Sequence, residues 1–300
     1  MTTTPEGAMD MIRARFGTHP GHRALHAKGV ICAGTFTATP EAAGLTRAAH
    51  MTGDPVPAIV RFSNGGGDPT VPDYEPDVRG LAVSFELPDG SRTDIVSQTL
   101  PRYPFRDQEG FLAALRISKP SLSALVALPG FIARYPGALR TLPETNRIIG
   151  QRAAFPARSY YAFHAYRWID AEGGERYVRY TWRPTVTEPE PSRQEAKRRG
   201  PDYLFDDLAQ RLARSPARMA LEVQIAGEGD DPDDPSDNWP ETRDRVTVGT
   251  LEVSAIDADA DDGIVFDPVR LTDGIEPSAD PVLSYRPAVY DLSHRARTSG

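Results

Sequence analysis

Apolar and polar residues alternate along several short stretches in the first third of the chain. Between residues 80 and 87 the apolar side chains occupy every second position, and the same alternation returns at residues 219–225. Successive side chains of a strand point to opposite faces of a sheet, so this pattern predicts strands with one buried face. Further strands are expected at residues 29–37, 56–63 and 94–98.

Apolar residues recur every three or four positions in three other places, which is the spacing of an amphipathic helix. The expected helices cover about residues 8–16, 108–150 and 203–213, and Gly17 closes the first. A break is expected near Pro129, because proline has no backbone N–H to donate. Helices are thus inserted between strands, and no proline- or glycine-rich linker divides the chain.

Composition and charge narrow the class of protein without identifying it. Hydrophobic residues make up 39% and charged residues 25% of the 300 positions, as in folded globular chains. The net charge of −8 argues against nucleic acid as a partner, because phosphate recognition needs clustered Lys and Arg. No apolar stretch resembles a leader or a membrane span, so we expect a cytoplasmic protein with no membrane partner. The single Cys32 excludes an internal disulfide.

Four polar side chains near the C-terminus are spaced by four, four and three residues: Arg286, Tyr290, His294 and Arg297. A helix over residues 287–297, beginning at a proline that suits its first turn, would align them along one face. In most proteins such a face lies in water. A tyrosine, whose ordinary pKa is about 10, binds a ferric ion when nearby positive charge stabilises its phenolate. If Tyr290 binds a ferric ion in this way, Arg286 supplies the positive charge, and Arg297 pairs with an anionic haem propionate.

The segment that contains these four residues resembles the proximal haem segment of catalases. It reads FDPVRLTDGIEPSADPVLSYRPAVYDLSHRAR and spans residues 266–297. The resemblance implies that Tyr290 is the axial iron ligand and that Arg286 is its hydrogen-bonding partner. It also implies that His294 and Arg297, in the H-R-x-R motif, bind the cofactor, with Arg297 at a propionate.

An earlier segment is similar to the distal motif of the same family. It reads HRALHAKG, residues 22–29, against the R-x-x-H-A-[KR]-G of catalases. The resemblance implies that His26 is the distal histidine and Arg23 a propionate ligand. An isolated histidine is more often structural, and the motif around His26 reverses that expectation.

Two further segments follow in the family's order. The segment VRFSNGGGDPTVPDYEPDVRGLAVSFE, residues 60–86, resembles the R-F-S and R-G-[FL]-A-V segments of catalases. Arg61 and Ser63 share a strand face there, and the resemblance implies that one contacts a propionate while the other supports the distal histidine. A surface position is the alternative for Arg61. In DIVSQTLPRYPFRDQEGF, Gln98 stands where catalases carry an asparagine that assists the distal histidine, and Phe111 where a phenylalanine stacks on the porphyrin.

The chain is shorter than typical catalases and lacks their long N-terminal arm and the region beyond the haem helix. It is most similar to the compact catalase-related peroxidases. This resemblance implies a single domain over residues 1–300, with a core of about 20–298. The implied fold is α+β, a minimal catalase core in which an antiparallel β-barrel carries inserted and flanking helices. The implied cofactor is haem b, and the absent arm favours a monomer or a small homo-oligomer.

The function implied by the resemblance is that of a haem-dependent peroxidase with weak catalase activity. It would reduce hydrogen peroxide or organic peroxides with an unidentified small organic reductant, and His26 would act as the general acid–base. A true catalase that dismutates hydrogen peroxide is the first alternative. Gln98 and Gly65 argue against it, because catalases commonly carry asparagine and a larger apolar residue at these positions.

Two other functions stay open at this point. Relatives of catalases isomerise fatty-acid hydroperoxides in the manner of allene oxide synthase, but they typically carry a threonine before the distal histidine, where this chain has Leu25. A non-enzymatic haem-binding protein would need no distal base. The intact motif around His26 therefore counts against it.

Overall fold

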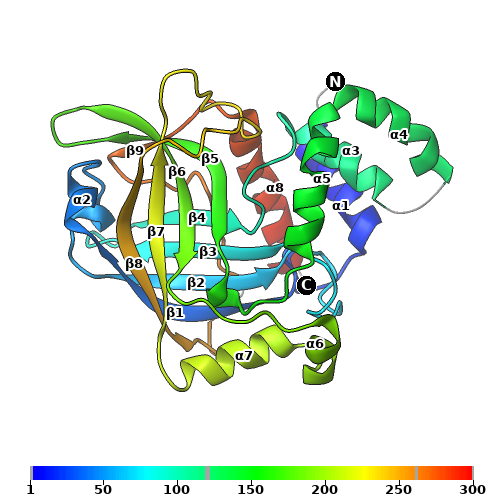
Figure 1. Ribbon diagram of the computed structural model, residues 1–300, viewed down its shortest axis with the longest axis horizontal. Coiled ribbons are helices and arrows are strands. Elements are labelled where there is room, and N and C mark those ends of the chain that lie inside the picture. The colour runs from blue at the N-terminus through cyan, green and yellow to red at the C-terminus, as the bar shows by residue number, and fades with distance from the viewer. Residues whose placement is uncertain (1–2, 119–121, 261–262, 299–300) are drawn as a thin grey trace.

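A computed structural model describes residues 3–118, 122–260 and 263–298. The strands within these residues form one antiparallel sheet that closes on itself as a barrel (Figure 1). They are β1 (Gly29–Ala38), β2 (Val56–Asn64), β3 (Arg79–Glu86), β4 (Arg92–Gln98), β5 (Tyr160–Ile169), β6 (Glu175–Pro184), β7 (Ala217–Ile225), β8 (Arg245–Ile256) and β9 (Ile275–Pro277). The predicted barrel with inserted and flanking helices is confirmed.

The barrel closes where β4 meets β5. The order of neighbouring strands is β4-β3-β2-β1-β8-β7-β6-β5-β9, and an additional pairing joins the end of β4 to β5. That pairing consists of a single residue pair, Gln98 opposite Tyr161. The short β9 extends the sheet beside β5. Eight strands thus form the barrel wall, and its junction lies at the carboxyl end of β4.

Aromatic and aliphatic side chains fill the barrel interior. Leu81, Val83 and Phe85 of β3 are buried, as their alternation predicts, and so are Leu221 and Val223 of β7. Strand β5 shows no such alternation in its sequence because both of its faces are covered, so the hydrophobic pattern missed it.

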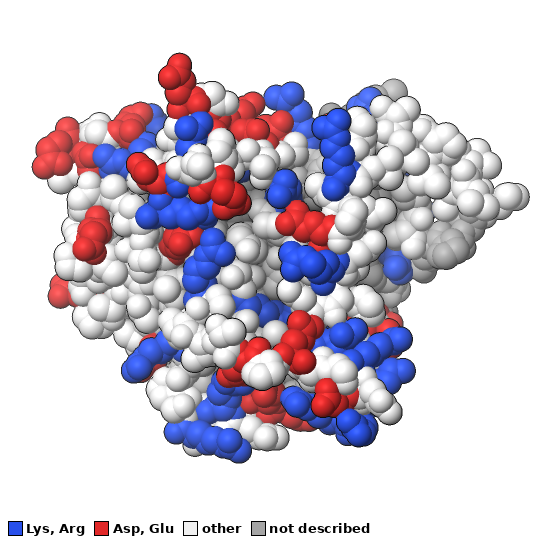
Figure 2. Space-filling view, in the orientation of Figure 1, with Lys and Arg blue, Asp and Glu red and all other residues white. Residues whose placement is uncertain are grey.

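Helices cover one end and one side of the barrel. They are α1 (Pro5–Phe16), α2 (Pro40–Ala43), α3 (Gln108–Ile117), α4 (Leu122–Arg134), α5 (Pro136–Ile149), α6 (Arg193–Arg199), α7 (Tyr203–Leu212) and α8 (Pro281–Thr298), with short 3₁₀ turns at Ala49–Met51 and Phe155–Ala157. In Figure 1 the helices α1, α3, α4 and α5 form a lobe beside the barrel, and α8 runs between this lobe and the strands. Figure 2 shows acidic and basic side chains interspersed over the visible barrel face.

Helix α8 begins six residues earlier than predicted. The sequence pattern placed its start at Pro287, which instead lies inside the helix. The start is set by Asp280, whose Oδ1 accepts hydrogen bonds from the backbone N–H groups of Val282 (2.7 Å) and Leu283 (3.2 Å). An acidic cap followed by Pro281 in the first turn is the stronger start signal.

The expected break near Pro129 is also wrong. Helix α4 continues through this proline to Arg134, and the chain leaves helical geometry at Tyr135, which precedes Pro136. The residue before a proline is disfavoured in the α conformation, and this rule places the boundary here. Of the helix predicted over residues 108–150, residues 119–121 lie outside the described residues.

Candidate functional site

A mostly apolar cavity of about 460 Å³ lies between one end of the barrel and the helices α1, α3 and α8. Its volume is in the range of cofactor and small-molecule sites. Nine of the ten predicted site residues line it: Arg23, His26, Arg61, Ser63, Gln98, Phe111, Arg286, Tyr290 and Arg297. Residues more than 250 positions apart in the sequence thus meet at one cavity.

His26 has an unusual backbone conformation. Its φ of 55° lies in the left-handed region, which among the described non-glycine residues is found here alone. The conformation is held on both sides: the His26 N–H donates to the carbonyl of Gly65 (3.0 Å), and its carbonyl accepts from Arg61 Nη2 (3.0 Å). The backbone is therefore bent so that the imidazole enters the cavity.

The His26 ring is fixed by Ser63, whose Oγ lies 3.0 Å from Nδ1. A Cβ atom at Gly80 would lie 2.6 Å from this Oγ and 2.7 Å from Nδ1, so only glycine leaves room for the pair. Burial, and then the positive charges of Arg61, Arg286 and Arg23, lower the pKa of His26 to about 3. The imidazole is therefore neutral near pH 7 and able to accept a proton.

Tyr290 and Arg286 lie on α8, one turn apart, and both line the cavity. The guanidinium of Arg286 donates to the phenol oxygen from Nε (3.0 Å) and also from Nη2. Burial opposes the charge of Arg286, but the phenol oxygen of Tyr290, together with Tyr166 and Tyr103, outweighs it, and the pKa of the guanidinium is raised. Arg286 thus remains a cation directed at the phenol oxygen, as the spacing of the two residues predicted.

Two residues that the sequence did not single out extend this pair. His164 on β5 is fully buried, and its Nε2 lies 2.8 Å from Arg286 Nη1. Its Nδ1 lies 2.5 Å from Asp280 Oδ2, so the proton sits on Nδ1 and Nε2 accepts from the guanidinium. Burial lowers the pKa of His164 to about 4, in spite of the raising effect of the Asp280 carboxylate.

Arginines gather at the edge of the cavity. Arg23 Nη2 (2.6 Å) and Arg297 Nη2 (3.2 Å) both donate to the carbonyl of Ile264, although they come from opposite ends of the chain. Arg61 packs against Gly29, where a Cβ atom would lie 2.4 Å from the guanidinium carbon. These three cations suit the carboxylates of a bound group.

The remaining predicted residues differ in how they meet the cavity. Phe111 lines it and packs its ring near Tyr103, with ring centroids 6.3 Å apart. Gln98 also lines it, but its amide is engaged by its own turn: Oε1 accepts from the N–H of Leu100 (2.7 Å) and Nε2 donates to the Leu100 carbonyl (2.8 Å). His294 does not line the cavity, and its buried Nδ1 has no hydrogen-bond partner among the described residues.

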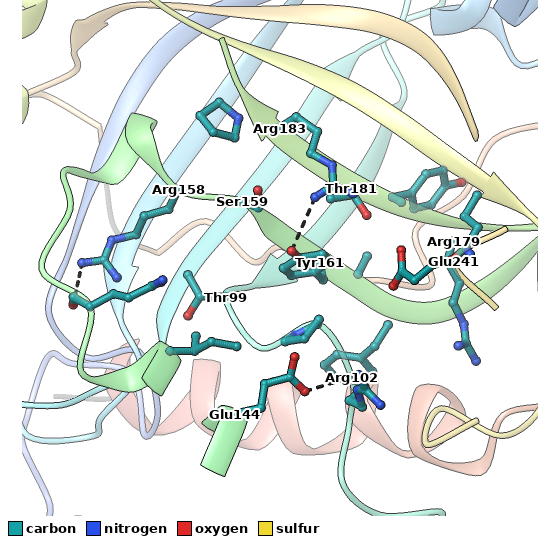
Figure 3. Close-up of a pocket in the computed structure, with 18 of the residues that line it drawn as sticks. Thr99, Arg102, Glu144, Arg158, Ser159, Tyr161, Arg179, Thr181, Arg183 and Glu241 are labelled. Carbon is teal, nitrogen blue, oxygen red and sulfur yellow. Dashed lines mark hydrogen bonds and ion pairs between the residues drawn. The ribbon is translucent and has the colours of Figure 1, made fainter. Parts of the chain in front are cut away.

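A second cavity, of about 480 Å³, lies across the barrel wall between α5, β5 and β6 (Figure 3). It is polar, and much of its charge is paired: Arg102 Nη2 lies 3.3 Å from Glu144 Oε2, and Arg183 Nη2 lies 2.9 Å from Glu222 Oε1. Phe163 lines both cavities. None of the predicted site residues lines the second cavity, so the first is the candidate active site.

The first cavity has the lining expected around an iron held in a macrocycle. Among the residues the structure describes, no group of three or more His, Cys, Asp or Glu side chains is placed to hold a bare metal ion. The phenol oxygen of Tyr290 could serve as one ligand, the guanidinium of Arg286 donates to that oxygen, and apolar walls surround the rest of the space. The cationic edge complements acidic substituents on such a group.

Comparison with known proteins places the chain in a family. The family model described as Catalase matches residues 18–300. A catalase-related peroxidase of Mycolicibacterium paratuberculosis is 46% identical over 98% of this chain and 95% of its own, and one of Synechococcus elongatus is 31% identical over 99% and 89%. A fungal catalase structure superposes with a TM-score of 0.81 at 23% identity, over 93% of this chain and 60% of that one. The chain belongs to the catalase family.

Proposed function

We propose that this protein is a haem-dependent peroxidase that reduces hydrogen peroxide or organic peroxides with a small organic electron donor. Membership of the catalase family implies a haem cofactor, and we propose haem b. The observation that carries the proposal is that two polar pairs, His26 with Ser63 and Arg286 with Tyr290, line the same apolar cavity.

In this proposal the first cavity would hold the haem, and Tyr290 would be its iron ligand. Arg23, Arg61 and Arg297 would hold its carboxylates, and Phe111 would contact its ring. When bound, the haem supplies the redox chemistry that no side chain of the chain supplies. The protein contributes binding, orientation and proton transfer.

His26 performs the proton transfer. Burial and the neighbouring arginines keep its pKa well below 7, so the ring is neutral near pH 7 and has a free nitrogen that would accept the proton of an incoming peroxide. With Nδ1 directed at Ser63, the other nitrogen, Nε2, is available to the substrate. The same nitrogen then returns the proton to the departing oxygen.

Arg286 would control the charge of the proposed iron ligand, Tyr290. Its two N–H donors stabilise the phenolate form of Tyr290, and the buried His164–Asp280 pair holds the guanidinium in place. Since His164 is neutral, the net charge beside the phenol comes from Arg286 alone. The Asp280 carboxylate fixes the tautomer of His164, which keeps Nε2 an acceptor.

The choice of peroxidase over catalase rests on Gln98, which lines the cavity. The Gln98 amide is held by the backbone of Leu100, so its N–H donor is directed at the Leu100 carbonyl. Gly65 does not add to this choice, because a Cβ atom there would lie 3.0 Å from Val78 and 3.1 Å from Asp77, which already fill the space. The two relatives named catalase-related peroxidase are also more similar to this chain than those named catalase.

The decisive experiment compares the two reactions in haem-loaded protein. Peroxide consumption, donor oxidation and oxygen evolution are measured with and without an aromatic donor. We expect donor oxidation to exceed oxygen evolution when the donor is abundant. Oxygen evolution that dominates under that condition would instead establish a true catalase, and consumption by neither route would leave a haem-binding protein.

A further inference from the structure

The helices α4 and α5 expose most of the large apolar side chains on the described surface. Eight such side chains are exposed in the described residues, and six belong to these two helices: Leu122, Leu125, Val126, Leu128, Leu139 and Leu142. Leu125 and Val126 lie about one helical turn from Leu122, and the three are 67%, 76% and 80% exposed. We call α4 and α5 the apolar hairpin. A contiguous exposed apolar surface of this kind marks a binding face.

The charge of this region is opposite to that of the whole molecule. Residues 110–143 contain four basic residues, Arg116, Lys119, Arg134 and Arg140, and no Asp or Glu, although the chain has a net charge of −8. In Figure 2 the visible face of the projecting lobe is mostly white, whereas acidic and basic side chains are interspersed over the barrel. The binding partner must therefore be both apolar and anionic.

We propose that the apolar hairpin docks onto an anionic lipid surface. Leucine and valine side chains enter the boundary between headgroups and acyl chains, while exposed Arg134 and Arg140 contact the acidic headgroups. The docked hairpin lies in the plane of the interface. No helix among the described residues is long and apolar enough to cross a bilayer. The proposal departs from our expectation of no membrane partner, which rested on the absence of an apolar stretch long enough to span a membrane.

A second copy of the chain fits the hairpin less well. A contact between two hairpins would have to neutralise the exposed Arg134 and Arg140 of both copies, and Glu144, the one carboxylate of α4 and α5, is already paired with Arg102. A contact between the hairpin and another surface of a second copy would join two different surfaces, and such contacts form open chains unless the rotation closes. Charge therefore favours the lipid surface.

The hairpin follows α3, which lines the candidate active site with Phe111, Leu112 and Leu115. Docking would place the apolar cavity close to the lipid surface. The docking itself does not depend on the proposed peroxidase activity, so the two can fail separately.

The test uses the full chain and vesicles of phosphatidylcholine, either alone or mixed with an equal amount of phosphatidylglycerol. We expect the protein to sediment with the mixed vesicles, and less so at high salt. The double variant Leu125→Glu/Val126→Glu should bind at least about tenfold more weakly, because it removes two inserted apolar side chains. Arg134→Gln/Arg140→Gln should lose the preference for the anionic vesicles.

The matched control is Val186→Glu, which places the same charge at an exposed apolar residue outside the hairpin. It should bind vesicles as the wild type does. Equal binding of wild type and the Leu125/Val126 variant would overturn the proposal. So would a wild-type dimer that ignores vesicles and becomes a monomer in that variant, which would make the hairpin a subunit interface.

Discussion

His26 combines a left-handed backbone with an imidazole that is neutral near pH 7. Replacing it by alanine should retain haem and lower the rate of reaction with peroxide by about 10²–10⁴-fold, the usual contribution of general acid–base assistance. Stopped-flow mixing with peroxide measures this rate. His26→Asn separates the chemistry from backbone strain, because asparagine tolerates the left-handed region. Recovery of the wild-type rate in either variant would exclude the imidazole as the base.

Tyr290 is the proposed iron ligand, and Phe at this position keeps the ring but removes the oxygen that Arg286 contacts. Tyr290→Phe should lose the phenolate ligand, with a changed absorbance spectrum and reduced haem content. Both are measured on purified protein. A spectrum and haem content equal to those of the wild type would show that the iron is held by another residue.

The side-chain amide of Gln98 makes two hydrogen bonds with the backbone of Leu100, so it cannot assist His26 as the asparagine of catalases is expected to do. In Gln98→Asn the shorter side chain can still accept from the Leu100 N–H, but its NH2 group no longer reaches the Leu100 carbonyl, which frees that donor for the cavity. Oxygen evolution should then rise relative to donor oxidation. An unchanged ratio would mean that Gln98 does not set the balance between the two reactions.

At the scale of elements, Asp280 joins the start of α8 to β5. It caps the helix through Oδ1 and fixes His164 through Oδ2. Asp280→Ala should lower the free energy of unfolding by about 1–3 kcal/mol, since a cap is lost and a buried imidazole N–H is left without its acceptor. Urea unfolding measures the change. Asp273→Ala, which removes an exposed partner of Arg47, is the control and should leave stability unchanged.

The elements that were predicted from the sequence are those whose hydrophobic or polar residues repeat over a few neighbouring positions. Strand β3 alternates because one face meets the core, and the spacing of Arg286 and Tyr290 follows from one helix turn. The resemblance to catalases supplied the roles of residues far apart in the chain. His164 could not be found in this way, because its partner Asp280 lies 116 positions away and neither residue stands in a pattern of its own. The start of α8 was missed because a later proline fitted the same rule.

At the scale of the whole molecule, buried histidines couple stability to pH. His50 is buried in the barrel, stacks on Phe85, and has no hydrogen-bond partner for Nδ1 among the described residues. Burial lowers its pKa to about 3, whereas in the unfolded chain it lies near 6.5. The unfolded state therefore binds one proton more between these values. The stabilising contribution of the neutral ring is complete above pH 6.5 and is lost as the pH falls toward 3.

His50→Leu removes this titrating imidazole and leaves the other titrating groups unchanged. As the pH falls from about 6 to 4, the free energy of unfolding should decrease less steeply in the variant than in the wild type. The two slopes should differ by about 1.4 kcal/mol per pH unit. Urea unfolding at several pH values gives both slopes. Parallel slopes would mean that His50 is protonated in the folded protein as readily as in the unfolded chain.

The single residue pair that closes the barrel, Gln98 opposite Tyr161, lies between the two cavities, since Gln98 lines the first and Tyr161 the second. Every other junction of the barrel wall is a longer ladder of hydrogen bonds. Opening this seam breaks the fewest bonds, so it is where local fluctuations of the folded barrel begin. Backbone amides beside it should exchange with deuterated solvent before those of β1 and β2. A ligand packed against Gln98 would slow that exchange, and the exchange of backbone amides in the wall of the second cavity, beside Tyr161, would slow with it.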